Sequence, residues 1–133
     1  MNYLFKEEPE NYSYDAFAKD GKTTWTGVKN PLAQKHLRSV RKGDLVFYYH
    51  TGKEKAVVGI AKATSDAYPD PADKTGSAHV VDLVPVKKLP RPVTLASIKA
   101  DARFKDFALV RMSRLSVMPV DEKLWGAIKA MAT

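Results

Sequence analysis

Short apolar stretches alternate along this chain with short segments of helical periodicity, and turn residues separate them. Residues 2–6, 44–50, 56–64 and 79–89 are rich in β-branched and aromatic residues, which indicates strands. Both faces of segment 44–50 are largely apolar, so we expect this strand to be central or to lie in a barrel wall. Its connection to segment 56–64 is too short for a helical crossover, which argues against a doubly wound parallel sheet.

Four short helices are expected, and each begins at a residue that favours a helix N-terminus. These starting residues are, in chain order, Ser13, Asn30, Thr94 and Asp121. The second helix is expected to reach about Val40, and Ala33 and Leu37 share an apolar face in it that should be buried. Strands interleaved with short helices indicate an α+β fold, a pseudo-β-barrel of about five to six short strands.

Prolines and glycines mark the irregularities that we expect. Strand 79–89 should end where Pro90 follows, and Pro85 within it requires a sheet edge or a bulge. Gly59 indicates a bulge or a close approach of the backbone to another segment. Residues 108–118 are expected to contain one or two further short strands.

The composition fits one globular domain over residues 1–133, with 44% hydrophobic and 28% charged residues. The absence of cysteine excludes disulfides, thiol catalysis and cysteine-ligated zinc. The three histidines lack the spacing of a metal site, and we expect neither a metal nor a cofactor. The chain has no apolar run that could span a membrane and no signal-peptide pattern at its start, so a cytoplasmic protein is expected.

Charge is unevenly distributed around a net value of +7. Residues 7–20 carry five carboxylates against a single lysine. Residues 29–42 contain no acid and five basic residues, which are Lys29, Lys35, Arg38, Arg41 and Lys42. Such a pattern produces a positively charged face, which suits a polyanionic partner such as a nucleic acid.

The stretch from Trp25 to His50 concentrates the candidate binding chemistry. Trp25 lies outside any periodic segment, so it is either a core residue or the wall of a ligand pocket. Tyr48 and Tyr49 should point to opposite sides of their strand, one into the core and one outward. His50 follows, and a neutral histidine offers one donor and one acceptor, which suits the edge of a base. Trp125 lies on an amphipathic helical pattern and is expected in the core.

Other candidates have two interpretations each. Lys6 and Glu8 follow a strand, either as a solvated turn or as contacts to a phosphate and a base. Arg111 and Arg114 can fork onto a phosphate, stack on a base or form surface salt bridges. Asn30 is a helix cap or a hydrogen-bond donor in a pocket.

These residues also carry a resemblance to a known family. The chain resembles the EVE domain, of the PUA-like superfamily, in Trp25-x-Gly27-Val28-Lys29-Asn30, Ala33, Leu37-Arg38, Gly43-Asp44 and Tyr49-His50. The resemblance extends to Phe5-Lys6-x-Glu8-Pro9, to Tyr68-Pro69-Asp70-Pro71, and to segments 88–95 and 109–117. It spans essentially the whole chain in the right order, and it implies a small β-barrel domain that reads a modified nucleobase in DNA or RNA.

The resemblance implies that a base such as methylated cytosine or adenine is flipped into a pocket formed by Lys6, Glu8, Trp25, Gly27, Val28, Asn30, Tyr49, His50, Tyr68, Pro69 and Asp70. Phosphate contacts are expected from Lys29, Lys35, Arg38, Arg111 and Arg114. Flipping costs a few kcal/mol and stacking returns about 1–3 kcal/mol per base, so phosphate contacts must supply the remaining affinity. The expected partner is DNA or RNA carrying a modified base, bound by a monomer.

Two alternatives stay open beside this non-catalytic interpretation. PUA-like relatives of the ASCH group include hydrolases that act on modified nucleosides. Lys6 and Glu8, with Thr24 or Thr26, would then supply a nucleophile and its base. The other alternative is an adaptor whose aromatic residues bind a peptide.

Overall fold

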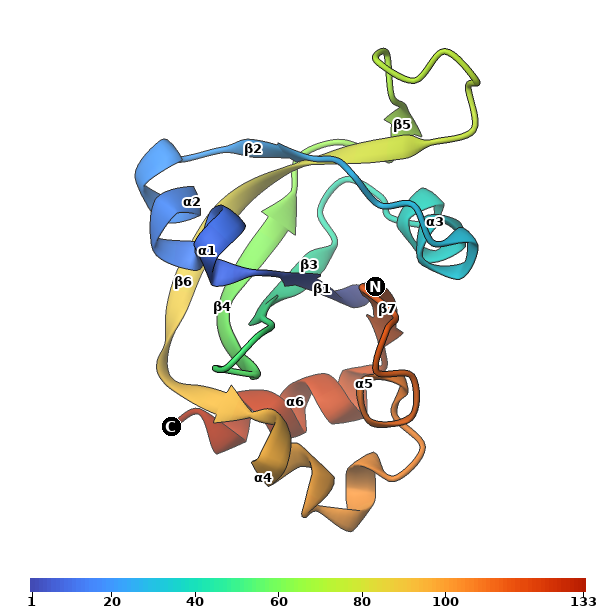
Figure 1. The fold of residues 1–133 in the computed structure, drawn as a ribbon. Coiled ribbons are helices and arrows are strands. Elements are labelled where there is room, and N and C mark those ends of the chain that lie inside the picture. The colour runs from blue at the N-terminus through green and yellow to red at the C-terminus, as the bar shows by residue number, and fades with distance from the viewer.

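Seven strands form one curled sheet in the computed structural model, which describes all 133 residues (Figure 1). They are β1 (Asn2–Glu7), β2 (Thr23–Trp25), β3 (Leu45–His50), β4 (Ala56–Ala63), β5 (Tyr68–Pro69), β6 (His79–Thr94) and β7 (Val117–Val120). The order along the sheet is β2-β6-β4-β3-β1-β7, and β5 pairs with β6. Strands β1 and β3 are parallel, and the other pairs are antiparallel. The α+β pseudo-barrel expected from the sequence is confirmed as a curled half-barrel, with seven strands in place of five or six.

Short helices border the sheet. They are α1 (Pro9–Tyr12), α2 (Tyr14–Asp20), α3 (Pro31–Arg38), α4 (Leu95–Lys99), α5 (Ala108–Arg111) and α6 (Glu122–Met131), with a 3₁₀ turn at Ala102–Phe104. The four expected helices are α2, α3, α4 and α6. Each begins at its expected cap, whose side-chain oxygen accepts a backbone N–H bond of 2.9–3.1 Å. Helices α4, α5 and α6 lie together at one end of the molecule (Figure 1). None of the helices has the length and apolar character needed to span a membrane.

The sheet curls until side chains from strands that are not neighbours touch. Trp25 of β2 packs against Phe5 of β1 and Tyr48 of β3, with ring centroids 5.4 and 5.3 Å apart. We call the side that bears these three rings the concave face. Successive residues of a strand point to opposite sides, so Phe47 lies on the convex face. There Trp125 of α6 stacks on it, with centroids 3.7 Å apart, which confirms Trp125 as a core residue.

Strand β6 does not end at residue 89 as the sequence suggested. It continues through Pro90 and Pro92 to the start of α4. Residues 89–92 oppose the single residue Val58 of β4, so these prolines lie where the hydrogen-bond ladder is already interrupted. A proline is tolerated in such a bulge because no ladder N–H is required from it. Pro85 also lies beside a register shift, which confirms the bulge expected there.

Gly59 permits the closest packing in the concave face. A Cβ atom at this position would lie 2.4 Å from Cε2 of Tyr14, a contact that no real side chain shows. The Tyr14 hydroxyl donates to the carbonyl of the next residue, Ile60, over 2.8 Å. Gly59 therefore makes room for α2 against β4, which confirms the close approach expected at this glycine.

The prediction of strands at residues 108–118 is wrong for the first part of that range. Ala108–Arg111 forms the one-turn helix α5, because the carbonyl of Phe107 accepts the N–H groups of Val110 and Arg111. Leu109 is thereby buried, and only β7 follows as a strand. Arg111 consequently lies at a helix end and Arg114 in the loop that leads into β7.

Candidate nucleic-acid interface

Trp25 is 5% exposed, as expected for a core residue. Its ring stands perpendicular to that of Tyr48 and closes the concave interior. A groove of about 250 Å³, which we call the Trp25 groove, runs beside it. The other residues that line this groove are Glu7, Asn11, Tyr12, Thr23, Thr24 and Thr26. Trp25 thus contributes only a small accessible surface to a largely polar depression.

His50 ends β3 on the same concave face and is 7% exposed. Its Nε2 accepts the backbone N–H of Tyr14 over 3.0 Å, and its Nδ1 lies 2.7 Å from Oε1 of Glu54. The first bond requires an unprotonated Nε2, so Nδ1 carries the hydrogen that is donated to Glu54. Both ring nitrogens have partners within the protein, so His50 holds α2 in place and presents no free nitrogen to a base.

The expectation that one of the two neighbouring tyrosines faces outward is wrong. Tyr48 and Tyr49 do point to opposite faces of β3, but both are buried, at 0% and 3% exposure. The reason is that both faces of the sheet are covered here, as the apolar character of this strand indicated. Tyr49 lies on the convex face with Nζ of Lys6 at 5.6 Å from its ring centroid.

Lys6 is separated from Trp25 by the β1 strand itself. It pairs with Tyr49 in the parallel register of β1 and β3, and its side chain lies on the convex face with it. Nζ donates to the carbonyl of Ser113 over 3.0 Å, and burial lowers the pKa of the Lys6 ammonium group. The residues expected to surround one base therefore lie on two opposite faces of the same strands.

The loop before α3 is fixed by Gln34, which the sequence analysis did not single out. The buried amide of Gln34 donates to the carbonyls of Val28 and His79, over 2.7 and 3.2 Å. Its oxygen accepts the N–H of His79 over 2.9 Å. Gly27 supplies the positive φ of 78° that this loop requires. The sequence signal for this role was the position of Gln34, a polar residue beside Ala33 on the apolar face of the helix.

Two grooves flank this loop. On one side, Gly27, Val28, Lys29 and Asp70 contribute to a groove of about 440 Å³. On the other, a groove of about 400 Å³, the Arg114 groove, is lined by Asn30, Leu32, Arg111, Met112, Ser113, Arg114 and Leu115. Asn30 caps α3 through its oxygen, which leaves its NH₂ group available to a ligand. The structure thus brings Asn30, Arg111 and Arg114 together, and Lys6 adjoins them through Ser113.

Tyr68, Pro69 and Asp70 lie away from this cluster. The Tyr68 hydroxyl donates to Oδ1 of Asp82 over 2.7 Å, and the hydroxyl of Thr24 donates to the same oxygen over 2.9 Å. Thr24 points to the opposite side of β2 from its neighbour Trp25, so Tyr68 lies outside the concave interior. Pro69 is exposed, and Asp70 accepts the N–H of a residue in its own loop.

The residues named for the alternative hydrolase do not bond to one another in the structure. No hydrogen bond joins Lys6, Glu8, Thr24 or Thr26 to one another; Lys6 is bonded to a carbonyl and Thr24 to Asp82. Glu8 is exposed at the start of α1.

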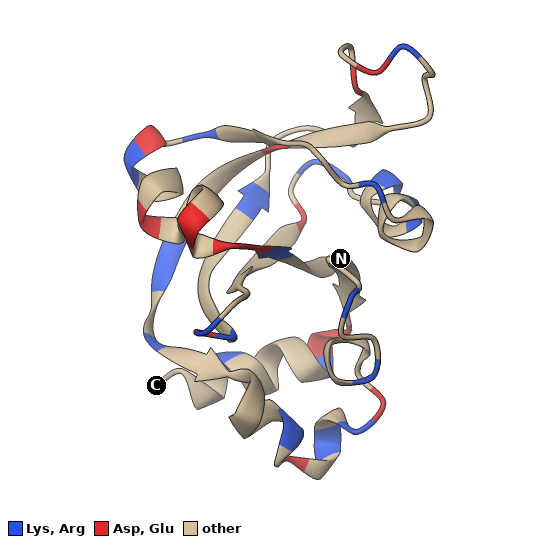
Figure 2. Ribbon diagram, viewed as in Figure 1, with Lys and Arg blue, Asp and Glu red and all other residues tan.

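Charge separates across the molecule as the sequence predicts. Figure 2 shows acidic residues around α1 and α2, whereas the charged residues of α3 are basic. None of the basic residues expected to meet nucleic acid forms an ion pair; these are Lys6, Lys29, Lys35, Arg38, Arg111 and Arg114. Their charges are therefore available to an anionic partner.

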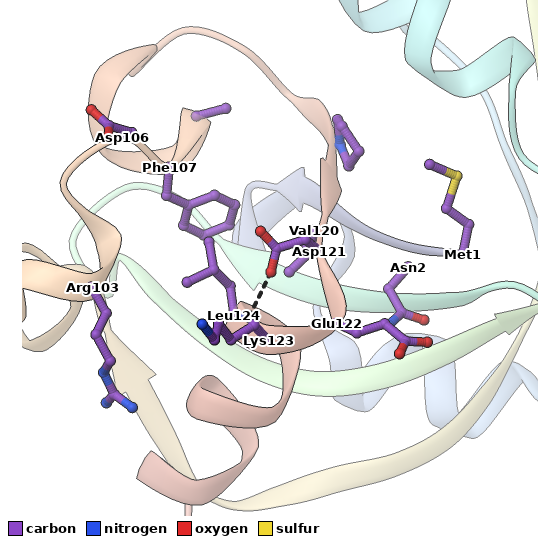
Figure 3. A pocket seen from close by; sticks show the side chains of 12 residues that line it. Met1, Asn2, Arg103, Asp106, Phe107, Val120, Asp121, Glu122, Lys123 and Leu124 are labelled. Carbon is purple, nitrogen blue, oxygen red and sulfur yellow. Dashed lines mark hydrogen bonds between the residues drawn. The ribbon is translucent and has the colours of Figure 1, made fainter.

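The largest groove of the molecule, about 800 Å³, lies at the start of α6 (Figure 3). It contains none of the residues expected at the site. Three carboxylates, Asp106, Asp121 and Glu122, line it together with Arg103 and Lys123. A phosphate backbone is disfavoured beside an acidic surface, so size alone does not select this groove as a nucleic-acid site.

The sequence profile of the EVE domain matches residues 1–131. This chain belongs to the EVE domain family. Human Thymocyte nuclear protein 1 is 27% identical to it, over 92% of this chain and 69% of that protein. The EVE-like fold is PUA-like, as the sequence suggested.

Solved structures agree with this assignment. Rpa0253 from Rhodopseudomonas palustris is 43% identical, with a TM-score of 0.93 over 98% of this chain and 92% of that one. Human THYN1, solved in complex with DNA containing 5-methylcytosine, is 25% identical, with a TM-score of 0.86 over 98% of this chain and 96% of that one. A Zymomonas mobilis ASCH protein, 10% identical with a TM-score of 0.58 over 98% and 97% of the chains, shares the fold alone.

Proposed function

We propose that this EVE domain binds DNA that carries a modified cytosine and reads the modified base without chemically altering it. The observation that carries the proposal is the complex of the human relative with DNA containing 5-methylcytosine. The structural match covers 98% of this chain and 96% of that solved chain, which supports a similar ligand for this domain.

Phosphates of the DNA backbone would follow the basic residues beside the loop before α3. Arg111 and Arg114 are exposed, lie in one groove with Asn30, and form no ion pair. Lys29 precedes Asn30 and lines the groove on the other side of this loop, where it would contact a further phosphate. Because each phosphate contact releases counterions, binding should weaken steeply with salt.

The flipped base would enter the Trp25 groove. Glu7 lines this groove, and its Oε1 already accepts from the N–H of Glu8 and the amide of Asn11. Oε2 of Glu7 has no partner within the protein, and a carboxylate is a suitable acceptor for the N4 amino group of cytosine. Trp25 exposes too little ring for full stacking, so discrimination must come from shape and hydrogen bonds. A fitted methyl group is worth about 1–3 kcal/mol, or about ten- to hundredfold selectivity.

The test compares matched oligonucleotides with cytosine, 5-methylcytosine, adenine and N6-methyladenine, as DNA and as RNA, by fluorescence anisotropy. Asn11→Trp places a large side chain in the Trp25 groove, and Glu10→Trp places the same side chain on the exposed surface of α1. The proposal expects the wild type and Glu10→Trp to prefer one modified base and Asn11→Trp to lose that preference. Equal binding to every oligonucleotide by all three proteins would refute it.

The phosphate contacts are tested separately. Arg111→Ala with Arg114→Ala should weaken binding to all sequences equally and lower the slope of log K against log salt by about 0.9 per lost contact. Lys105→Ala removes an exposed charge outside the Arg114 groove and should leave affinity nearly unchanged. A loss of base preference without a change in salt slope would assign these arginines to the base instead.

A further inference from the structure

A second, smaller pocket lies on the convex face. The ends of β1 and β3, the turn at residues 51–55 and helices α4 and α5 enclose a volume of about 200 Å³. Three lysines line it, Lys6, Lys55 and Lys99, and no carboxylate does. We call it the lysine pocket. The β1–β3 strand pair separates it from the Trp25 groove, because Lys6 and Trp25 lie on opposite faces of the sheet.

Lys6 brings a poorly solvated positive charge to this pocket. Its ammonium group has three N–H donors, and the Ser113 carbonyl is the one protein atom to which it donates. The face of the Tyr49 ring gives a further, weak attraction at 5.6 Å. No carboxylate neutralises it, and burial lowers the pKa of Lys6. An anion placed here would supply the compensation that a partly buried charge otherwise lacks.

The other two lysines are carried by segments that are held together. Lys55 adopts a φ of +46°, an uncommon backbone conformation for a side chain of this size. Its carbonyl accepts the N–H of Leu95 over 2.8 Å, which ties the turn to the first residue of α4. Lys99 lies in the last turn of that helix, which Ile98 anchors in the core. The side chains of both lysines are exposed and form no ion pair.

Hydroxyl groups complete the lining. Tyr49 and Thr51 both border the pocket, and the Tyr49 hydroxyl has no hydrogen-bond partner in the protein. Burial raises the pKa of Tyr49 to about 12, so at neutral pH this hydroxyl is a donor and not a phenolate. Ammonium and hydroxyl donors without a carboxylate match the acceptor oxygens of a phosphate group.

We propose that the lysine pocket binds a phosphate group, which Lys6 holds from within and Lys55 and Lys99 hold from the rim. Its volume suits one phosphate and not a whole nucleotide. The group belongs either to the backbone of a bound nucleic acid or to a free phosphate ester, and the chemistry is the same in both cases. The site does not depend on the proposed reading of a modified base, which uses the other face of the strands.

Inorganic phosphate is the first probe, titrated into the full-length chain and compared with chloride at equal ionic strength. Backbone amide shifts in two-dimensional NMR should change locally at Thr51, Gly52 and Ser113. Lys6→Met keeps the aliphatic stem and should weaken phosphate binding about tenfold. Lys55→Gln and Lys99→Gln remove exposed charges that the fold does not need, and each should weaken binding about two- to fivefold.

Lys53→Gln is the matched control, because Lys53 is exposed in the same turn but does not line the pocket. The proposal is overturned if phosphate shifts amides throughout the basic surface without saturation, or if Lys53→Gln weakens binding as much as Lys55→Gln. Since Lys55→Gln and Lys99→Gln alter exposed side chains, a folding failure of Lys6→Met leaves the test intact.

The source of the phosphate is decided with an oligonucleotide. If the group is a backbone phosphate, Lys55→Gln with Lys99→Gln lowers the salt slope of oligonucleotide binding by about 0.9. If it belongs to a free ester, the slope stays at the wild-type value while the local phosphate shifts are still lost. Both results support the pocket, and neither requires that base reading in the Trp25 groove be correct.

Discussion

The two faces of the β1–β3 strand pair end differently, although the same two strands build both. On the concave face the last side chain of β3 is His50, and both of its ring nitrogens are bonded within the protein. On the convex face the last cationic side chain of β1 is Lys6, whose ammonium group has one protein acceptor. The polar atoms of His50 on the concave face are therefore all bonded within the protein, whereas Lys6 on the convex face keeps N–H donors that no protein atom accepts.

This difference separates residues that stabilise the fold from residues available to a ligand. Trp25, Tyr48 and His50 are buried aromatic rings whose loss should appear first as instability. Lys6 and its neighbours carry exposed or half-buried donors whose loss should appear mainly in binding. A variant of the concave face that abolishes DNA binding while the protein remains stable would contradict this division of roles.

Trp25→Ala should have the largest effect. Removing a buried indole that contacts Phe5 and Tyr48 should lower the free energy of unfolding by about 3–5 kcal/mol. Urea denaturation measures this change, and Trp25→Phe, which keeps a ring, should lose distinctly less. A stable Trp25→Ala protein that no longer binds DNA would instead make Trp25 chiefly a pocket wall.

Gly59→Ala should follow closely. A Cβ atom at 2.4 Å from Tyr14 forces α2 to move, which should cost about 3 kcal/mol of stability. Gly126→Ala is the control, because nothing lies within 4 Å of a Cβ atom there and its helix should gain about 0.5–1 kcal/mol. Thermal unfolding of the two variants should therefore shift in opposite directions. A Gly59→Ala protein as stable as the wild type would show that the concave packing is looser than the structure indicates.

The sequence was most informative where local chemistry decides the structure. All four helix caps and the strands β3 and β4 were predictable, because a cap or an apolar run acts over a few residues. Pro90 led to the wrong end for β6. A proline breaks a strand only where the neighbouring strand needs the missing N–H, and the bulge opposite Val58 of β4 removes that need. The sequence of β6 alone does not show which strand lies beside it.

The candidate site was less predictable, because it depends on which face of a strand each residue occupies. The sequence placed Lys6 and Tyr49-His50 at strand ends. It did not indicate that Lys6 and Tyr49 share one face of the sheet and that Trp25 lies on the other. Asn30, Arg111 and Arg114 come together through the contact of α3 with the segment before β7, which joins distant parts of the chain. Lys55 and Lys99 carried no signal beyond their charge.

His50→Leu tests the His50 end of the concave face. It leaves the buried N–H of Tyr14 without an acceptor, which should lower the free energy of unfolding by about 2 kcal/mol. Glu54→Ala removes only the half-exposed partner of the other ring nitrogen and should cost less than about 0.5 kcal/mol. If both variants lose equal stability in urea denaturation, the contact with Glu54 and not the bond to Tyr14 is what closes this end.

The smallest effect concerns Lys6 on the convex face, where Lys6→Met should alter how stability depends on pH. Burial lowers the pKa of Lys6 from its ordinary value of 10.5, so between the lowered pKa and 10.5 the unfolded chain binds more protons than the folded one. The free energy of unfolding of the wild type should therefore rise relative to that of Lys6→Met as pH increases toward 10.5. Burial raises the pKa of Tyr48 and Tyr49, which destabilises the fold above pH 10, but equally in both proteins.

Urea denaturation of both proteins between pH 7 and pH 10.5 measures the difference in the free energy of unfolding. A difference that stays constant with pH would mean that the Lys6 ammonium group is as well solvated as in the unfolded chain. Saturating phosphate should reduce the pH dependence, because an anion in the lysine pocket favours the charged form of Lys6.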